Sequence, residues 1–507
     1  MKRLIGGVAA LGLSAASAAL AQTPWAPPQA TDHYYRGAQA ELQLRLQVRP
    51  NTGTARNLIL FVGDGMGTST LTAARILQGQ RVGADGASTW TTMDRLPYAA
   101  LVRTYSHDSL VADSAPSATA LLTGVKARND TIGVDHTVAV DDCHASVGHG
   151  ATSLFGRAED AGLATGIVTT ARITHATPAA AYARAAQRDW EADVDLSAAA
   201  VAAGCADIAS QLIAWPHGDG FEIVLGGGRA SFLPKTAKDP EYGDVLGRRA
   251  DGRDLVAEWE EKHPHGRFVW NRSQLERATQ QPGVRLFGLF EPDHMRYEAE
   301  RSRDAGGEPS LAEMTRAAIS TLQRHGLGYV LLVEAGRIDH AHHVGRADLA
   351  LMDTIALDEA VAAALEMVDV TDTLIIVTAD HSHNLTISGY PPRDAPVLGA
   401  TTGEGGARAV AADGKGYAIL NYTTGPGAMD GPRRDVDQLG QDQLAYPALV
   451  PMRSAAHGGE DVAARATGPW AHLVGGTIEQ NLIYHVMVHA LGLDGRRATA
   501  ATALADE

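Results

Sequence analysis

Carboxylate and imidazole side chains follow short apolar runs at four places in the chain. The run 373–377 leads to Asp380 and His381, and the run 57–62 leads to Asp64. Two further runs, 166–170 and 329–333, lead to the same kinds of residue, namely His175 after the first and Glu334, Asp339 and His343 after the second. Short β-branched runs are typical of buried parallel strands, and ligands bind at the carboxyl ends of such strands. Because carboxylates and imidazoles bind divalent cations, the pattern predicts a metal site there.

The spacing of these residues supports the same interpretation. Asp339 and His343 are four residues apart, so a helix would place them on one face, where they can share a metal ion. Asp380 and His381 are adjacent, which suits a loop that turns both towards one ion. By contrast, His457 alone in a loop is more often structural, and Arg188 alone is an ordinary surface arginine.

A serine is a candidate nucleophile. Ser114 follows Asp113 at the predicted start of a helix, where free N–H groups and the helix dipole favour an anion. In isolation, such a serine is more often an N-cap residue. The sequence contains no Gly-x-Ser-x-Gly motif, so a nucleophilic Ser114 would need a metal ion to lower its pKa.

Composition and the N-terminus indicate an exported protein. Lys2 and Arg3 precede an apolar run, 4–20, and a small-x-small signal ends at Ala21, which predicts a signal peptide over 1–21 and a periplasmic or secreted protein. No membrane anchor is predicted after it. The net charge of −16 argues against a nucleic-acid partner, whereas bound cations would still admit a phosphate substrate. The two cysteines, Cys143 and Cys205, predict one disulfide, with two unpaired thiols as the alternative.

The alternation of strand and helix patterns predicts an α/β fold. We expect a large, mostly parallel central sheet with helices on both faces, formed by one domain over 22–507. A segment rich in Gly, Pro and Asp, at about 391–453, is predicted to be a small irregular insertion. Residues 33–49 are compatible with either a helix or a strand, and helices are expected over 68–78, 197–213 and 475–491.

Several motifs together resemble the alkaline phosphatase family, closest to its animal-type branch, from about residue 57 to residue 491. The matching segments are Gly63-Asp64-Gly65-Met66-Gly67, Asp113-Ser114-Ala115, Thr174-His175-Ala176-Thr177-Pro178, Gly336-Arg337-Ile338-Asp339-His340, Thr378-Ala379-Asp380-His381-Ser382-His383 and His457-Gly458-Gly459-Glu460. The resemblance implies a phosphate monoesterase that forms a phosphoserine at Ser114. It also implies two zinc ions and one magnesium ion.

The resemblance assigns a role to each matching residue. Asp339, His343 and His457 would hold one zinc ion, and Asp64, Asp380 and His381 the second. Magnesium would be held by Asp64, Thr177 and Glu334, and Arg188 would bind the phosphate. His175, His340 and His383 would surround these groups without binding a metal directly.

Further features come from the resemblance alone. The two cysteines, Cys143 and Cys205, fall where the animal-type branch pairs two cysteines. A calcium site of that branch matches Glu241, Phe290 (through its carbonyl), Glu291 and Glu308, where Glu308 replaces the usual aspartate. The family also implies a homodimer and a crown-like lobe at the insertion.

Two other functions fit parts of the pattern. A phosphodiesterase or sulfatase would be built on the same metal-bearing sheet. Thr177 and Glu334 distinguish a monoesterase from these enzymes, because the magnesium half-site that they would form favours monoesters. A non-catalytic zinc or phosphate binder of the periplasm would have no need of Ser114 at the start of a helix.

Overall fold

The protein was described from a computed structural model, which covers residues 27–495 except 430, 434 and 437–444. The predicted signal peptide therefore lies outside the described residues. The chain divides into two compact units, Met1–Arg49 and Pro50–Glu507.

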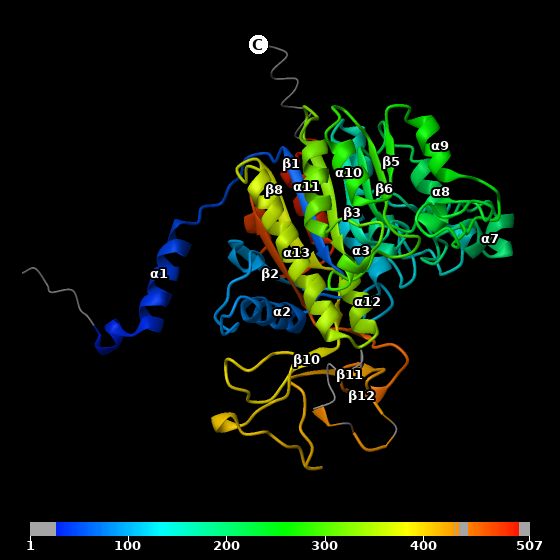
Figure 1. Cartoon of the computed structure of the whole chain (residues 1–507). Coiled ribbons are helices and arrows are strands. Elements are labelled where there is room, and N and C mark those ends of the chain that lie inside the picture. The colour runs from blue at the N-terminus through cyan, green and yellow to red at the C-terminus, as the bar shows by residue number, and fades with distance from the viewer. Residues whose placement is uncertain (1–26, 430, 434, 437–444, 496–507) are drawn as a thin grey trace, which may run out of the picture. The chain divides into compact units, whose positions relative to one another are not determined.

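The first unit settles the ambiguity over residues 33–49 in favour of a helix. A short 3-10 helix, Pro28–Thr31, precedes helix α1 (His33–Gln47; Figure 1). The Asp32 side chain caps α1 by accepting a hydrogen bond from the Tyr35 N–H at 3.0 Å. Glu41 and Arg45 form an ion pair at 2.8 Å along the helix. These local interactions prevail over the alternation of leucines, which alone would suit a strand.

The second unit is built on a ten-stranded sheet. Its strands, in spatial order, are β15 (Gly476–Glu479), β2 (Tyr98–Arg103), β14 (Val462–Thr467), β8 (Thr373–Ala379), β1 (Asn57–Gly63), β7 (Tyr329–Ala335), β3 (Ala164–Arg172), β4 (Ile223–Gly227), β6 (Leu286–Leu289) and β5 (Arg267–Val269). Strand β14 is antiparallel to both neighbours, whereas the other pairings of this sheet in the described residues are parallel. This confirms the predicted α/β class.

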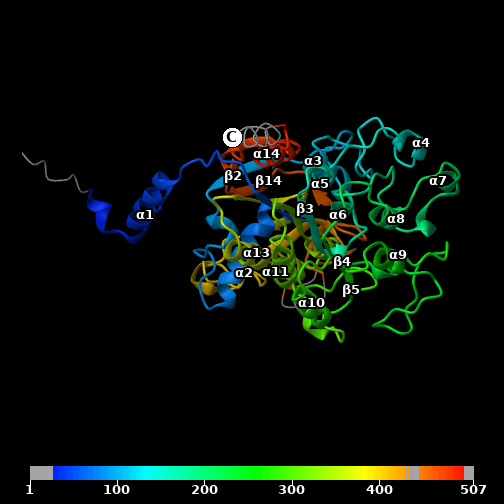
Figure 2. The same cartoon turned by 90° about the horizontal axis from the view of Figure 1, so that it is seen from above.

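Helices cover both faces of the sheet. On one face, α13 packs against α2, α11, β1 and β7, and on the other face α3, α5, α6 and α14 form a second layer. Figure 2 shows the strands between these two layers. The helices of the unit are α2 (Thr68–Arg81), α3 (Ser114–Thr123), α4 (Cys143–Ser146), α5 (Leu154–Asp160), α6 (Ala176–Ala179), α7 (Ala198–Ala202), α8 (Ile208–Ile213), α9 (Leu255–Lys262), α10 (Arg272–Thr279), α11 (Leu311–Leu322), α12 (Arg337–His343), α13 (Ala347–Met367) and α14 (Leu482–Ala490).

Two of the predicted helices are wrong in extent. The segment 197–213 forms two short helices, α7 and α8, because Gly204 adopts a left-handed conformation (φ 80°) between them. The segment 475–491 begins with the edge strand β15 and becomes helical only at α14. The prediction over 68–78 is confirmed by α2.

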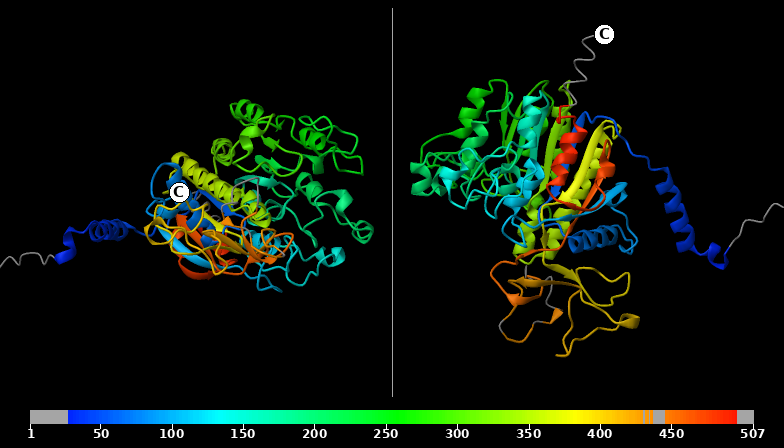
Figure 3. Two further views of the ribbon diagram at one scale, coloured as in Figure 1. Left: turned by 60° about the horizontal axis from the view of Figure 1, so that its bottom comes forward. Right: turned by 180° about the vertical axis from the view of Figure 1, so that it is seen from behind.

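A small lobe, residues 385–451, extends from one end of the sheet, and we call it the crown lobe. It carries a three-stranded sheet in the order β10 (Leu385–Ile387), β11 (Leu420–Gly425) and β12 (Ala448–Pro451). The lobe lies below α2 and α12 in Figure 1, and the right view of Figure 3 shows it below the rest of the unit. Its apolar residues form a separate small core with α2 and α13, which includes Leu420 and Tyr422 from the lobe and Leu351 from α13.

Cys143 and Cys205 form a disulfide, as predicted, across 62 residues of sequence. Within the described ranges, no helix has the length and apolar character needed to cross a bilayer.

Reduction of this disulfide should lower the stability of the protein. Closing a loop of this length removes about 4 kcal/mol of chain entropy from the unfolded state. We expect the Cys143→Ser/Cys205→Ser variant to unfold at a lower urea concentration than the wild type. Unfolding of the wild type under reducing conditions should approach that of the variant, and equal midpoints with and without reductant would contradict the expectation.

Candidate active site

Three buried carboxylates lie at the same edge of the sheet because neighbouring strands are in register. Gly63 of β1 is paired with Ala335 of β7 and with Ala379 of β8. Asp64 and Asp380 therefore leave the sheet side by side, and Glu334 lies further back on β7, where it pairs with Val62 of β1 and with Thr169 of β3. All three side chains are fully buried. A sheet edge that concentrates buried negative charge in this way requires cations.

The first group of ligands surrounds Ser114. Its Oγ lies 3.3 Å from Asp64 Oδ1 and 3.2 Å from His381 Nε2. His381 Nε2 is also 3.4 Å from Asp380 Oδ2. Ser114 is the first residue of α3, and the Asp113 side chain caps this helix through the Ala115 N–H at 2.7 Å. The serine oxygen, two carboxylates and an imidazole thus converge on one point.

The second group is built from three chain segments, two of which a short antiparallel pairing brings together. On α12, His343 Nε2 lies 3.2 Å from Asp339 Oδ2, which is the arrangement predicted from their spacing. Strand β13 (His457–Gly458) pairs with β9 (Ser382–His383), so that His457 lies opposite His383. The Nε2 atoms of both histidines lie 3.5 Å from Asp339 Oδ1. The structure therefore places His383 as close to this group as the expected ligands.

A third group lies on the β3 side of Asp64. The ligand atoms of Asp64, His175 and Glu334 are within 4.8 Å of one another. One oxygen of Glu334 accepts a hydrogen bond from Thr169. In the described residues, its other oxygen and Thr177 Oγ1 are buried without a hydrogen-bond partner of good geometry. Buried oxygens without partners are costly, and a hard cation would satisfy both.

Hydrogen bonds to backbone carbonyls fix the tautomers of three histidines. Nδ1 of His343 bonds to the Ala455 carbonyl at 2.6 Å, Nδ1 of His457 to the Ala112 carbonyl at 2.9 Å, and Nδ1 of His381 to the Ser382 carbonyl at 3.1 Å. A carbonyl only accepts, so Nδ1 carries the proton in each ring. Each Nε2 lone pair is therefore free to bind a metal. The two Nε2 atoms of His343 and His457 face each other at 3.2 Å, which suits a shared cation.

The electrostatics of the site also fit cations. Burial and the neighbouring Asp380, Asp339 and Glu334 raise the pKa of Asp64 well above its usual range. Burial likewise raises the pKa of Glu334 to about 7. Divalent cations reverse both effects, because they replace repulsion between carboxylates by attraction.

Arg188 points to the same site from the segment after α6. Its guanidinium donates to Asp113 Oδ1 at 3.0 Å and to His175 Nε2 at 3.1 Å. Because arginine only donates, His175 must carry its proton on Nδ1, an atom that is buried and without a partner in the described residues. His175 thus offers an N–H donor to the site, and Arg188 is held beside the start of α3.

The expected calcium ligands are only partly brought together. Oxygens of Glu241, Glu291 and Asp304 lie within 4.8 Å of one another, so Asp304 takes the place expected for Glu308. Glu308 instead accepts the Arg296 N–H at 3.0 Å, and the Arg296 guanidinium lies 3.3 Å from Glu291. Phe290 is fully buried next to this cluster in sequence. The oxygen ligands suit Ca²⁺, and Arg296 supplies a competing positive charge.

Two histidines near the site were not assigned a role from the sequence. The His294 ring lies 4.1 Å from the His340 ring and 5.4 Å from the His175 ring. His342 is fully buried and lies between Thr70 and Tyr422. No sequence pattern points to His294. His342 could have been singled out from the sequence, because it stands next to His343 in the segment that holds Asp339 and His343 but on a different face of α12.

The sheet and the clustered ligands define a metal-dependent hydrolase of the α/β class. A family model for alkaline phosphatase matches residues 55–493. The tissue-nonspecific alkaline phosphatase of Gallus gallus is 43% identical over 490 residues, which cover 94% of this chain and 93% of that protein. The Homo sapiens enzyme of the same name is 42% identical over 476 residues, 90% of this chain and 88% of that protein.

A solved structure agrees with these sequence matches. The Thermus thermophilus alkaline phosphatase is 27% identical, with a TM-score of 0.64 over 88% of this chain and 93% of that one. The chain belongs to the alkaline phosphatase family, and it hydrolyses phosphate monoesters with the help of metal ions.

Metal binding should release protons. Because burial raises the pKa of Glu334 to about 7 without cations, chelator-treated protein at pH 6 holds a proton that a cation displaces. We expect zinc and magnesium added to such protein in weak buffer to acidify the solution and to restore activity lost on EDTA treatment. Full activity in a sample shown to be free of metal would contradict the metal requirement.

Proposed function

We propose that the chain is an exported alkaline phosphatase whose nucleophile is Ser114. The observation that supports this most directly is the position of Ser114 Oγ, between Asp64 and His381 at the start of α3. The N–H groups at the start of a helix and a nearby arginine stabilise negative charge on a phosphoryl group.

We assign the metal ligands to three ions. Asp339, His343 and His457, with His383 close by, would hold one zinc ion, and Asp64, Asp380 and His381 a second. Asp64, Thr177 and Glu334 would hold magnesium. When bound, these ions lower the pKa of the serine hydroxyl and stabilise negative charge on the oxygens of phosphate.

The residues of the chain then act in sequence. Ser114 Oγ gives its proton to solvent water and attacks phosphorus in line with the leaving group, so that a phosphoserine forms as the ester P–O bond breaks. The alkoxide takes a proton from water and departs as the alcohol. Arg188, held by Asp113 and His175, donates to two phosphate oxygens and orients the group. Water then attacks the phosphoserine from the side the alkoxide has left, which releases inorganic phosphate and returns Ser114.

The charges of the site balance a dianionic substrate in an acidic protein. Asp64, Glu334, Asp339 and Asp380 supply about four negative charges, and three divalent ions supply about six positive charges. The site is then roughly +2, and Arg188 adds one more positive charge. A phosphate monoester is therefore attracted although the chain carries a net charge of −16.

Three further assignments complete the proposal. The disulfide fits a periplasmic or secreted location. We propose a homodimer, as the family implies, and a calcium ion at Glu241, Glu291 and Asp304.

Replacement of Ser114 tests the covalent step. We expect Ser114→Ala to lose at least about 10³-fold in kcat, the scale seen when a nucleophile is removed, while it retains its zinc. Ser117→Ala, one turn along the same helix, is the matched control. It removes a hydroxyl that donates to the Asp113 carbonyl at 2.8 Å and lies 3.4 Å from Asp380 Oδ2, and it should cost about tenfold or less. Full turnover by Ser114→Ala in a phosphate-release assay would eliminate the phosphoserine.

Substrate comparison tests the class of ester. A monoester has a third free oxygen that can bind near the expected magnesium ligands. The kcat/KM for an aryl phosphate should therefore be much higher than the kcat/KM for the corresponding methyl aryl diester. Thr177→Val keeps the size of the side chain and removes Oγ1. It should reduce the monoester value by about 10- to 100-fold and leave the diester value nearly unchanged. A wild type that prefers the diester would instead indicate a phosphodiesterase.

A further inference from the structure

The crown lobe is attached to the segments that carry the expected ligands of one zinc ion. The backbone N–H of Ala455 donates to the His343 carbonyl at 2.9 Å, and the Tyr446 N–H donates to the Gly345 carbonyl at 2.8 Å. Tyr446 belongs to the lobe and Ala455 to the segment that follows it, and both contacts reach the end of α12, the helix that carries Asp339 and His343. Two backbone hydrogen bonds therefore connect the end of α12 to the lobe and to the segment that follows it.

Strand β11 makes the side-chain contacts of this attachment. Tyr422 and Thr424 are two residues apart, so both point to the same face of β11. The Tyr422 hydroxyl lies 2.8 Å from His342 Nδ1. Thr424 Oγ1 accepts hydrogen bonds from Asn384 Nδ2 at 2.8 Å and from the Ala456 N–H at 2.9 Å. Asn384 follows His383, and Ala456 precedes His457, so β11 contacts both ligand segments.

His342 connects three elements through its two ring nitrogens. Nδ1 contacts Tyr422 of the crown lobe, and Nε2 lies 3.0 Å from Thr70 Oγ1 of α2, the helix that follows Asp64. His342 is fully buried and Tyr422 is 3% exposed. Hydroxyl groups can donate or accept, so both contacts are satisfied whichever nitrogen carries the proton. A buried ring held at both nitrogens fixes the rotation of α12 about its axis.

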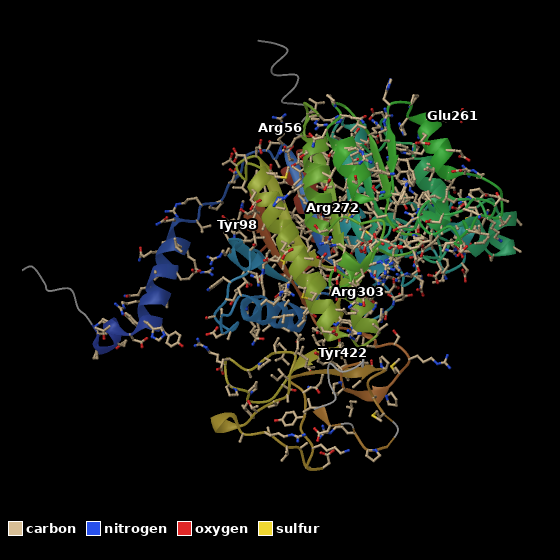
Figure 4. The ribbon with its side chains drawn as sticks, in the orientation of Figure 1. Arg56, Tyr98, Glu261, Arg272, Arg303 and Tyr422 are labelled. Atoms are coloured by element: carbon tan, nitrogen blue, oxygen red, sulfur yellow. A yellow bond between two sulfur atoms is a disulfide. The ribbon has the colours of Figure 1, made fainter. Side chains whose placement is uncertain are left out.

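We propose that Tyr422 and His342 are positioning residues for the zinc site formed by Asp339, His343 and His457. Neither residue belongs to the groups of candidate metal ligands in the described residues. Tyr422 acts through His342, which holds α12 in the rotation that aims Asp339 and His343 at His457. This inference rests on the proposed function, and it assigns the crown lobe a part in metal retention. Figure 4 shows Tyr422 where the lobe approaches the ends of α12 and α13.

The chain offers a matched control in Tyr446. It is 4% exposed and belongs to the same small apolar core as Tyr422, but its hydroxyl donates to the Leu398 carbonyl within the lobe, at 3.2 Å. Tyr422→Phe and Tyr446→Phe therefore remove the same atom from similar surroundings. Only the first variant breaks a contact with α12.

The test measures transfer of zinc from fully loaded protein to a chromogenic chelator. We expect Tyr422→Phe to release one zinc per chain about tenfold faster than the wild type, and Tyr446→Phe to release it at the wild-type rate. With excess zinc, kcat of Tyr422→Phe should return towards the wild-type value. Thermal unfolding of both variants, measured in parallel, should show similar small losses. Equal zinc release from the two variants would overturn the proposal.

A double-mutant cycle tests whether Tyr422 acts through His342. If it does, His342→Gln/Tyr422→Phe should release zinc no faster than His342→Gln alone. Additive effects of the two substitutions on the rate of zinc release would show that Tyr422 does not act through His342. If His342→Gln does not fold, the comparison of Tyr422→Phe with Tyr446→Phe still decides the proposal. A wild type that binds no zinc would instead disprove the proposed function, so the two failures are distinguishable.

Discussion

Buried like charge is the constraint on which the rest of this structure depends. Asp64, Glu334 and Asp380 are fully buried, and Asp339 is 3% exposed, all at one edge of the sheet. Four such carboxylates without counter-charge would cost far more than the few kcal/mol that separate folded from unfolded proteins. Bound cations, or protons where cations are missing, must therefore offset this charge, and the raised pKa of Asp64 reflects the same demand.

The surrounding architecture meets this constraint with rigid elements. Parallel strands in register deliver Asp64, Glu334 and Asp380 to one edge of the sheet, and backbone carbonyls hold the rings of His343, His457 and His381 by their Nδ1 atoms. Gln480 donates to the Asp380 carbonyl at 2.6 Å, so even the segment after β15 supports the site. Positions set by strands and short helices vary little, which suits in-line chemistry that depends on the placement of a few atoms.

The sequence predicted the fold class and the main ligand groups because both follow from local patterns. Apolar runs that end in acidic residues or histidine identified the strands and the edge at which they meet, and the i, i+4 spacing placed Asp339 and His343 on one helical face. Long-range pairing could not be read in this way. The bridge between β13 and β9 brings His457 to His383, and no local pattern encodes that pairing.

One miss had a specific physical cause, because a left-handed Gly204 divided an otherwise helical segment. Asp304 lies beside Glu241 and Glu291, whereas Glu308 accepts the Arg296 N–H, and no local pattern distinguishes these two acidic residues. The pairing of β10 with β11, far along the chain, was likewise not visible in any local pattern. The sequence shows His342 as one of the histidines of α12. Its proposed function depends on its contact with Tyr422, and no spacing in the sequence predicts that contact.

Strand β14 has a consequence for biosynthesis. It follows His457 closely and inserts between β8 and β2, so the sheet is incomplete until residues 462–467 are present. A chain whose C-terminal part is still missing cannot close either the sheet or the group of candidate metal ligands that includes His457. Metal loading of this group must then follow completion of the polypeptide.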